Sequence, residues 1–373
     1  MIKSNKISAT LILILVIITC MVSGKEFIQM NYPDTIYPCS GVTKTGKLSD
    51  YFADIKGSTG DATVYYFESR LPGATVFLIG GTHPNEPAGF ITATLLVENA
   101  VVKEGRLIVI PQASLNGFTY TDPLEGYPQY FNIKTKSGNR KFRFGSRGFS
   151  PIYQWPDPLV YLHYPSGQQL SGVETRNLNR SYPGRPDGSF TEKIAYAIVQ
   201  LIKKENVDIA FDLHEAAPEI PIINAIVAHE KGRDIAATAV LNLELDNLTY
   251  ALEISPKNFH GLTHREWGDY TQVSPFLMET SNPIQGRLRG KTDSELILNG
   301  RDTNYYAAAK LGSLRIAYEL TGEPLPLRVA RHIQGFRILI NAFTEFFPDK
   351  KIKIDNLPTY GEIIESGVGA YLN

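Results

Sequence analysis

The 373-residue sequence predicts an α/β fold: one domain with a mostly parallel, mixed central sheet flanked by helices. Two observations lead to this prediction. Short apolar runs rich in β-branched and aromatic residues alternate with longer segments of helical spacing, which is the pattern of a parallel sheet covered by helices. Several runs are apolar without interruption, as expected for strands buried on both faces. No repeat or flexible linker divides the chain after its N-terminal leader, so one large domain is expected.

Each expected element rests on its own residues. Residues 74–81 read Ala-Thr-Val-Phe-Leu-Ile-Gly-Gly and residues 207–214 read Val-Asp-Ile-Ala-Phe-Asp-Leu-His, two apolar runs that end in turn or polar residues. Runs of the same kind predict the other strands, and apolar residues at intervals of three and four predict the helices. The predicted strands span residues 62–68, 74–81, 105–112, 207–214, 222–228, 248–254 and 274–280, and the predicted helices span residues 86–102, 190–205, 231–243, 302–320 and 327–346.

The long segment 116–188 fits neither period. It is rich in Tyr, Pro, Gly and Arg. Loops of this length inside a compact domain usually carry function. We therefore expect an irregular, functional insertion at about residues 116–188.

The N-terminus predicts an exported protein. Lys3 and Lys6 precede an apolar run at residues 9–22, which ends in Ser23 and Gly24. This is the pattern of a secretory signal peptide, so residues 1–24 are expected to be the leader and residues 25–373 the catalytic domain. The alternative is a retained anchor, although fourteen residues are short for a membrane span of about 20.

Export would place the protein outside the cytoplasm, as a secreted, periplasmic or cell-surface protein. Contact with a membrane is expected only through the leader or through a lipid attached to Cys20. Cleavage after Gly24 would leave Cys39 as the only cysteine, so no intramolecular disulfide is expected.

Composition excludes several classes of protein. With 43% hydrophobic and 20% charged residues, the chain is neither disordered nor collagenous nor a coiled coil. The net charge is −1, and loss of Lys3 and Lys6 with the leader leaves −3. No excess of positive charge is present to hold a phosphate backbone, so nucleic acid is not an expected partner.

Two predicted strand ends carry metal-ligand residues. Residues 80–89 read Gly-Gly-Thr-His-Pro-Asn-Glu-Pro-Ala-Gly, which places His83 and Glu86 where a strand gives way to a helix. His214 ends the strand at residues 207–214. Ligands gather at the carboxyl edge of an open parallel sheet, so His83, Glu86 and His214 are expected to bind one Zn²⁺ and to leave a fourth position for water. Asp212 is a candidate to orient one of these ligands, or an ordinary buried hydrogen-bond partner.

Two further signals concern the substrate and the base. Asn179 and Arg180 stand together in a loop bounded by Pro and Gly, and an arginine suits two-pronged binding of a carboxylate. Glu279 ends the apolar strand at residues 274–280, where packing alone would not select an acid. Beside a metal site it is a candidate general base; its alternative is a strand-end carboxylate facing solvent.

These four blocks, in this order, resemble the zinc carboxypeptidase (M14-like) superfamily, and in particular its succinylglutamate desuccinylase/aspartoacylase branch. Residues 81–89 look like the branch's Gly-Thr-His-Gly-Asn-Glu-x-x-Gly signature, Asn179-Arg180 like its Asn-Arg pair and Asp212-Leu213-His214 like its third-ligand strand. The resemblance implies that His83, Glu86 and His214 bind zinc, that Asn179 and Arg180 hold the substrate carboxylate, and that Glu279 activates water.

The sequence also departs from the family. Pro84 replaces the usual Gly, and Asn177 replaces the usual Asp before Leu-Asn-Arg, which removes one charge. The family's further arginine, which helps to stabilise the oxyanion, has Arg147 and Arg176 as its nearest candidates. The catalytic tyrosine of the peptidases is not located; Tyr250 and Tyr270 are candidates. Residues 263–267, Thr-His-Arg-Glu-Trp, resemble a zinc motif only superficially and are taken as a decoy.

The expected function is hydrolysis of an amide bond by zinc-activated water in an exported enzyme. A deacylase acting on a small N-acyl amino acid is the first expectation. The alternative is a metallocarboxypeptidase that trims peptides or cell-wall stem peptides, which export and the aromatic segment 118–164 favour. An alternative of another class is a non-catalytic peptide- or glycan-binding protein on the same fold.

Overall fold

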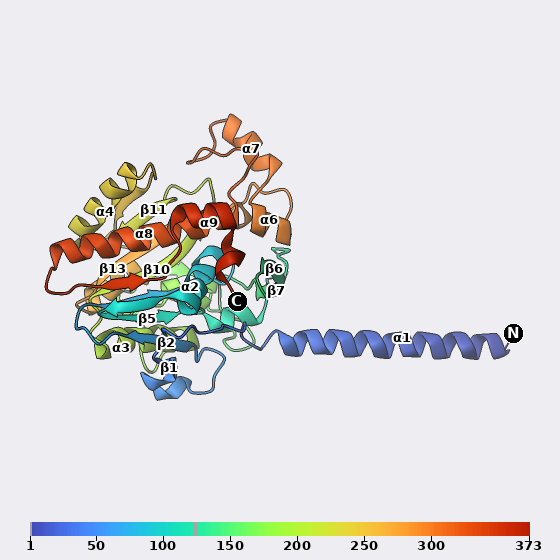
Figure 1. The fold of residues 1–373 in the computed structure, drawn as a ribbon. Helices are drawn as coiled ribbons and strands as arrows, with labels where there is room; N and C mark the ends of the chain where they lie inside the picture. Colours follow the sequence, from blue (N-terminus) through green and yellow to red (C-terminus); the bar gives the residue numbers. More distant parts are fainter. Residues whose placement is uncertain (1, 123–124) are drawn as a thin grey trace.

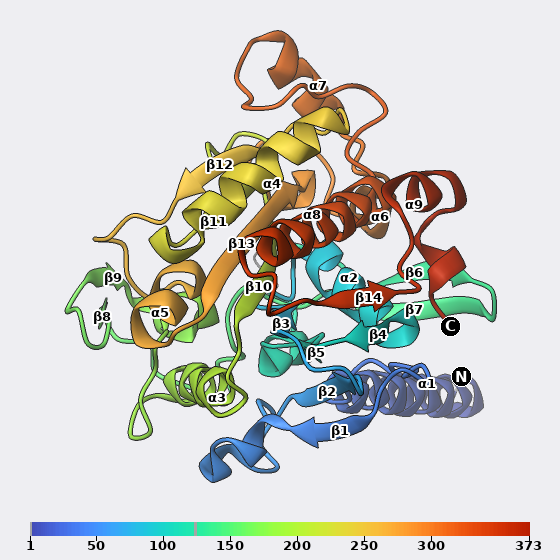
Figure 2. The same ribbon diagram turned by 60° about the vertical axis from the view of Figure 1, so that its left-hand side comes forward.

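A computed structural model describes residues 2–122 and 125–373. It confirms the predicted α/β class. Eight strands form the central sheet in the order β1-β2-β5-β3-β10-β13-β11-β12 (Figures 1 and 2). The neighbours β5, β3, β10 and β13 are parallel, and β11 and β12 are parallel to each other but antiparallel to β13. The sheet strands are β1 (Lys44–Lys47), β2 (Thr63–Glu68), β3 (Thr75–Ile79), β5 (Arg106–Ile110), β10 (Ile209–Ala216), β11 (Ala225–Ala228), β12 (Ala251–Ile254) and β13 (Ser274–Ser281).

Helices cover both faces of this sheet. One face packs against α2, α4 and α8, and the other packs against α3 and α5. Strand β3 shows why both faces are apolar: Val76 and Leu78 contact the first group, whereas Phe77 and Ile79 contact the second. The helices of the body are α2 (Pro87–Asn99), α3 (Phe190–Lys204), α4 (Arg233–Leu245), α5 (Thr263–Tyr270), α6 (Ser294–Asn299), α7 (Thr303–Lys310), α8 (Leu325–Phe346) and α9 (Tyr360–Ser366).

One predicted helix is wrong in its second half. The pattern at residues 302–320 predicted a single helix, but α7 ends at Lys310. Gly312 follows with φ of +67°, a left-handed conformation in which glycine ends helices without steric cost. Asp302 caps the start of α7, because its side chain accepts hydrogen bonds from the N–H groups of Asn304 and Tyr305.

The insertion at residues 116–188 is less irregular than expected. It contains two antiparallel hairpins, and the first packs Phe131 and Phe142 into a third apolar cluster beside α2 and α8. The hairpins are β6 (Tyr130–Thr135) with β7 (Gly138–Arg143), and β8 (Val160–Leu162) with β9 (Gln169–Ser171). A further pair, β4 (Val101–Glu104) with β14 (Lys353–Asp355), was also not predicted.

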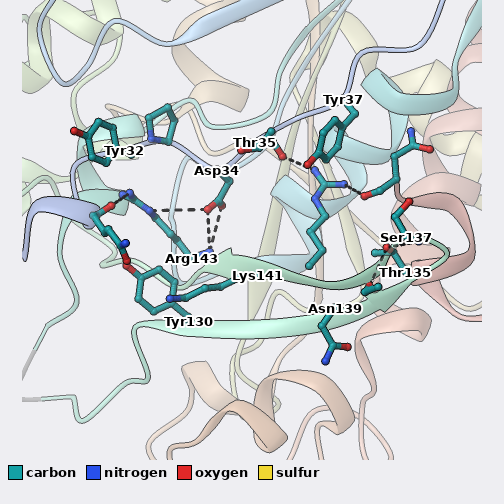
Figure 3. A pocket seen from close by; sticks show the side chains of 15 residues that line it. Tyr32, Asp34, Thr35, Tyr37, Tyr130, Thr135, Ser137, Asn139, Lys141 and Arg143 are labelled. Carbon is teal, nitrogen blue, oxygen red and sulfur yellow. Dashed lines mark hydrogen bonds and ion pairs between the residues drawn. The ribbon is translucent and has the colours of Figure 1, made fainter. Parts of the chain in front are cut away.

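The N-terminal helix α1 (Ile2–Gln29) extends away from the body (Figure 1). The stretch Asn5–Gln29 is long enough and apolar enough to cross a membrane, and its apolar 18-residue window is not buried against the protein. The helix continues past Gly24, where the leader was expected to end. Directly after it, the chain lies along β7, where Asp34 and Arg143 meet (Figure 3).

Candidate metal centre and cleft

The predicted ligands meet at one edge of the sheet. His83 and Glu86 follow β3, and His214 lies near the end of β10, which pairs in parallel with β3 so that Ile79 is opposite Asp212. Helix α2 starts directly after Glu86, with Pro87 at its first position. A Cβ atom at Gly89 would lie 2.3 Å from the carbonyl oxygen of Leu213, so only glycine lets α2 approach β10 this closely.

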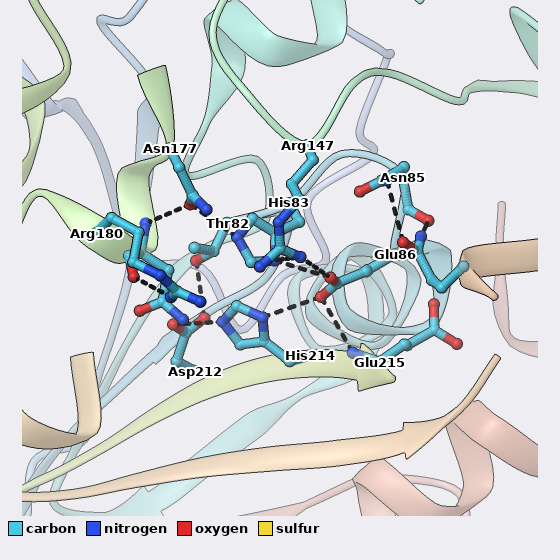
Figure 4. A network of polar contacts seen from close by, with 12 residues as sticks. Thr82, His83, Asn85, Glu86, Arg147, Asn177, Arg180, Asp212, His214 and Glu215 are labelled. Atoms are coloured by element: carbon cyan, nitrogen blue, oxygen red, sulfur yellow. Dashed lines mark hydrogen bonds and ion pairs between the residues drawn. The ribbon is translucent and has the colours of Figure 1, made fainter. Parts of the chain in front are cut away.

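The three side chains form a compact group that could hold a metal ion. Nδ1 of His83 lies 2.8 Å from Oε1 of Glu86, and Nδ1 of His214 lies 2.9 Å from Oε2 of the same carboxylate (Figure 4). One ligand atom from each residue lies within 4.8 Å of the others, and all three residues are buried. Two imidazoles and one carboxylate converging on a point are the donor set of a catalytic zinc site.

The outer nitrogen of each imidazole has its own partner. Nε2 of His83 lies 2.9 Å from Oδ1 of Asn177, and Nε2 of His214 lies 2.7 Å from Oδ2 of Asp212. Such contacts fix the rings of metal-binding histidines so that the opposite nitrogen faces the metal. Both Nδ1 atoms are therefore held toward Glu86.

Asp212 is itself held by two threonines. The hydroxyl of Thr82 donates to its Oδ1 and the hydroxyl of Thr263 donates to its Oδ2, each at 2.8 Å. The decoy segment therefore contributes Thr263 to the site. Its His264 lies outside the His83–Glu86–His214 group and contacts the hydroxyl of Ser255 instead.

Burial and charge shift the pKa values of the group. Burial lowers the pKa of His83 to about 4, and the charge of Arg147 adds to this effect. Burial also disfavours the charged forms of His214 and Glu86, but the opposite charges around each of them outweigh it. The carboxylates of Asp212 and Glu86 raise the pKa of His214, and the two histidines lower the pKa of Glu86 below its usual range. A metal ion would displace the proton from His214, because ligand nitrogens must be deprotonated.

Glu279 lies beside the group on β13, directly opposite His214 in the parallel ladder. Its Oε2 has no hydrogen-bond partner in the part of the chain that the structure describes. Burial raises the pKa of Glu279 to about 8, and the charges of His214 and Arg147 only partly oppose this. A partly buried carboxyl with one free oxygen at this place has the protonation behaviour of a general acid or base.

All eight predicted site residues line one cleft of about 800 Å³. They are His83, Glu86, Arg147, Arg176, Asn179, Arg180, His214 and Glu279. Residues that sequence reasoning missed line it too, among them Tyr120, Tyr127, Glu174, Phe259 and His264. Tyr250 and Tyr270 do not: the buried Tyr250 donates its hydroxyl to the carbonyl of Arg331, and Tyr270 is exposed on α5.

The arginines differ in how many of their donors are occupied. Arg147 is 43% exposed, and its Nη1 lies 3.3 Å from both Oε1 of Glu86 and Nδ1 of His83. Arg176 is fully engaged: Nε and Nη2 bind Asp157 at 2.8 and 3.0 Å, while Nη1 donates to the carbonyl of Phe149 and to the hydroxyl of Tyr120.

Arg180 keeps most of its donors free for a ligand. Its Nη1 donates to the carbonyl of Asn179 at 2.6 Å, its Nε lies 3.9 Å from Glu174, and its guanidinium lies 5.3 Å from the ring centre of Phe259. Burial lowers its pKa to about 10, so it is charged near neutral pH. The side chain of Asn179 is used within the fold, where its Oδ1 accepts a hydrogen bond from the N–H of Thr263.

Comparisons with known proteins agree with the motifs. No family model matches the chain. It is 39% identical over 135 residues to the N-alpha-acetyl-L-2,4-diaminobutyric acid deacetylase of Halomonas elongata, a stretch that is 36% of either protein, so the chain spans about a third of that relative. The resemblance to the succinylglutamate desuccinylase/aspartoacylase branch is thereby confirmed.

Two solved structures resemble the fold. The Csd4 cell shape determinant of Helicobacter pylori aligns with a TM-score of 0.45 and 13% identity, over 82% of this chain and 59% of that one. A succinylglutamate desuccinylase of Silicibacter sp. TM1040 aligns with a TM-score of 0.41 and 16% identity, over 80% of this chain and 64% of that one.

Proposed function

We propose that the protein is an exported, zinc-dependent amide hydrolase, and that its substrate is an N-acyl amino acid or a related small amide. The observation that carries this proposal is the convergence of His83, Glu86 and His214 in a cleft that also holds the free Oε2 of Glu279. The similarity to a deacetylase supports hydrolysis of an amide rather than binding alone.

Zinc fits the residues that are present. His83 and His214 would bind through Nδ1 and Glu86 through its carboxylate, since the outer Nε2 atoms are taken by Asn177 and Asp212. When bound, zinc supplies a Lewis acid that polarises the amide carbonyl and lowers the pKa of water.

Glu279 serves as the proton carrier in this proposal. Its carboxylate accepts the proton of the attacking water and then donates it to the leaving nitrogen, so no covalent enzyme intermediate is required. The free Oε2 leaves one oxygen available for this transfer. A nearby divalent cation favours the ionised carboxylate, so zinc would lower the pKa of Glu279 from about 8 toward neutrality.

The two available arginines hold the substrate. Arg180 has free donors for a substrate carboxylate, and the partly exposed Arg147 lies beside Glu86, where negative charge develops on the carbonyl oxygen. Asn179 positions this wall of the cleft through Thr263. Arg176, bound to Asp157, supports the wall rather than the substrate.

A carboxypeptidase is the second candidate function. A cleft of about 800 Å³ is larger than a small N-acyl amino acid requires, and its aromatic lining, which includes Tyr120, Tyr127 and Phe259, offers surface for further residues of a peptide. Both candidate functions use the same zinc ligands and the same base.

The reaction products distinguish the deacylase from the carboxypeptidase. The zinc-loaded full chain is incubated with N-acyl amino acids, free-carboxyl peptides and muropeptides, and the products are measured by mass spectrometry. Release of an acyl acid supports the deacylase, and release of a C-terminal residue supports the carboxypeptidase. The Glu279→Gln variant is the control: it should retain zinc and lose turnover at least about 100-fold. Substrate binding without turnover in the wild type would favour the non-catalytic binding protein.

A further inference from the structure

The end of the apolar helix α1 is fastened to the body. Arg143 of β7 is almost completely buried, and its guanidinium donates hydrogen bonds to the carbonyl oxygens of Gln29 and Met30. A third bond reaches the carbonyl of Phe118 at 3.1 Å. The last carbonyls of a helix lack partners within the helix and carry partial negative charge, so a buried arginine stabilises this end strongly.

The residues after α1 are fastened to the same strand. The carboxylate of Asp34 accepts hydrogen bonds from the backbone N–H of Arg143 at 3.2 Å and from Nε2 of Gln112 at 3.0 Å. Nη2 of Arg140 donates to the carbonyl of Thr35 at 2.6 Å. These contacts join α1 to the hairpin β6–β7 without a flexible linker, so the helix axis has a defined direction relative to the body.

Helix α1 is built like a membrane span and is continuous through the expected cleavage point. The stretch Asn5–Gln29 has 25 residues, or about 37 Å at 1.5 Å per residue, which exceeds the hydrocarbon thickness of a bilayer.

The hairpin beside the exit of α1 carries unpaired positive charge. Lys134, Lys136 and Lys141 are exposed, and none of them forms an ion pair with any residue that the structure describes. Nζ of Lys141 lies 3.5 Å from the ring centre of Tyr130. The hairpin lies at the edge of the body nearest to α1 (Figure 1). Lys25 adds a fourth cation, and Glu26 is the adjacent acid. Exposed tyrosines, Tyr32 and Tyr37, flank the exit.

We propose that α1 is retained as a membrane anchor and that the surface formed by Lys25, Lys134, Lys136, Lys141, Tyr32 and Tyr37 rests on anionic lipid headgroups. Clustered lysines next to a span are attracted to anionic lipids, and tyrosines concentrate at the boundary between lipid and water. Lys3 and Lys6, at the other end of α1, favour an orientation with the N-terminus inside and the body outside.

Retention of α1 is tested on the protein from cells. Its intact mass is measured after extraction from the membrane fraction. A chain that includes residues 2–24 supports the proposal. A chain that starts at Cys20 or Lys25 overturns it, whatever the catalytic activity.

Contact of the hairpin with lipid is tested by hydrogen exchange of residues 130–143. The full chain is placed in nanodiscs of phosphatidylcholine alone or with phosphatidylglycerol. Exchange should be slower in the anionic discs, and high salt should remove the difference. A triple variant that carries Lys134→Glu, Lys136→Glu and Lys141→Glu should lose this protection at least about fivefold.

The matched control carries Lys193→Glu, Lys203→Glu and Lys257→Glu; of these, Lys193 and Lys203 lie on α3, away from α1 in both views (Figures 1 and 2). It should keep the protection. Equal exchange of wild-type protein in neutral and anionic discs, or equal loss in both triple variants, would overturn the proposed lipid surface. The salt comparison needs no variant, so it decides the matter even if a triple variant fails to fold.

Discussion

Asp212 and His214 lie two residues apart on β10, and Oδ2 of the aspartate is 2.7 Å from Nε2 of the histidine. Residues at this spacing point to the same face of a strand, so one short segment supplies both the imidazole and its support. The corresponding support for His83 is the neutral amide of Asn177, at 2.9 Å. The two imidazoles of the candidate metal centre are therefore held by partners of unequal charge.

This inequality predicts opposite effects on zinc affinity. Asp212→Asn should weaken zinc binding 10- to 100-fold, because a carboxylate makes its imidazole a stronger ligand. Asn177→Asp should strengthen it, since it adds the charge that His83 lacks. Competition with a zinc-binding dye measures both. Thr263→Val is the matched control: it removes one donor to Asp212 but no charge, and its effect should be smaller. Weaker binding by Asn177→Asp would contradict this account.

The two arginines offered by the sequence should separate into a catalytic and a structural residue. Arg147→Ala should lower kcat/KM about 100-fold and change the free energy of unfolding by less than about 0.5 kcal/mol, since its side chain is partly exposed and reaches Glu86. Arg176→Ala should mainly lower stability, because it breaks the two bonds to Asp157. Steady-state kinetics and urea unfolding of both variants measure this. A similar loss of kcat/KM in both, with unchanged stability, would reject the distinction.

A buried ion pair lies next to the candidate metal ligands. Nη1 of Arg328 lies 2.6 Å from Oε1 of Glu215, and both side chains are fully buried. The backbone N–H of Glu215 donates to Oε2 of Glu86 at 3.1 Å. Arg328→Met should cost about 3–5 kcal/mol, because it leaves a buried carboxylate unpaired.

The double variant Arg328→Met with Glu215→Leu should recover part of that stability, since both charges are then absent. Urea unfolding of the metal-free proteins gives the comparison. Arg331→Met, on the same helix but partly exposed, is the control and should cost less. A double variant less stable than Arg328→Met would show that the charges themselves are not the cause.

Glu323 predicts a dependence of stability on pH. Burial raises its pKa to about 7 from the usual 4.5, although Arg331 and Arg328 oppose this. The folded state therefore favours the protonated form. The contribution of the protonated Glu323 to folding stability is complete below about pH 4.5 and is lost as pH rises through about 7. Glu323→Gln should gain up to about 3 kcal/mol relative to wild type between these limits. Unfolding at about pH 4.5 and at about pH 8 tests this, with the exposed Glu319→Gln as control. The prediction would be rejected if the difference in the free energy of unfolding between Glu323→Gln and wild type were the same at both pH values.

Much of the fold was predictable because local sequence patterns determine its strands and helices. All seven predicted strands exist. Most of them are apolar runs that pack on both faces, whereas β12 is largely exposed. The hairpin β6–β7 was missed although Tyr130–Thr135 alternates between buried and exposed positions, because the surrounding glycines, prolines and arginines hide a period of two in so short a strand. The helix predicted to reach residue 320 failed at Gly312, where one left-handed residue outweighs the helical spacing.

The candidate site was also only partly predictable from the sequence. The candidate metal ligands and Glu279 could be located because they lie near or just beyond the carboxyl ends of recognisable strands. The supports contributed by Thr82, Thr263 and Asn177 could not, because they join segments far apart in the sequence through contacts that no local pattern encodes. Arg176 illustrates the opposite problem. An arginine fits a substrate-binding role by residue type, but its partner in the structure is Asp157, whose position follows from the tertiary fold.

The position of Arg143 has a mechanical consequence. Arg143 donates a hydrogen bond to the carbonyl of Gln29 in the last turn of α1. Arg147, four residues further along the chain, forms an ion pair with Glu86. Four peptide units span at most about 15 Å, so little slack separates the two arginines. A displacement of α1 is therefore expected to shift Arg147 at the candidate site. A short stretch of chain therefore connects the proposed membrane helix to the cleft.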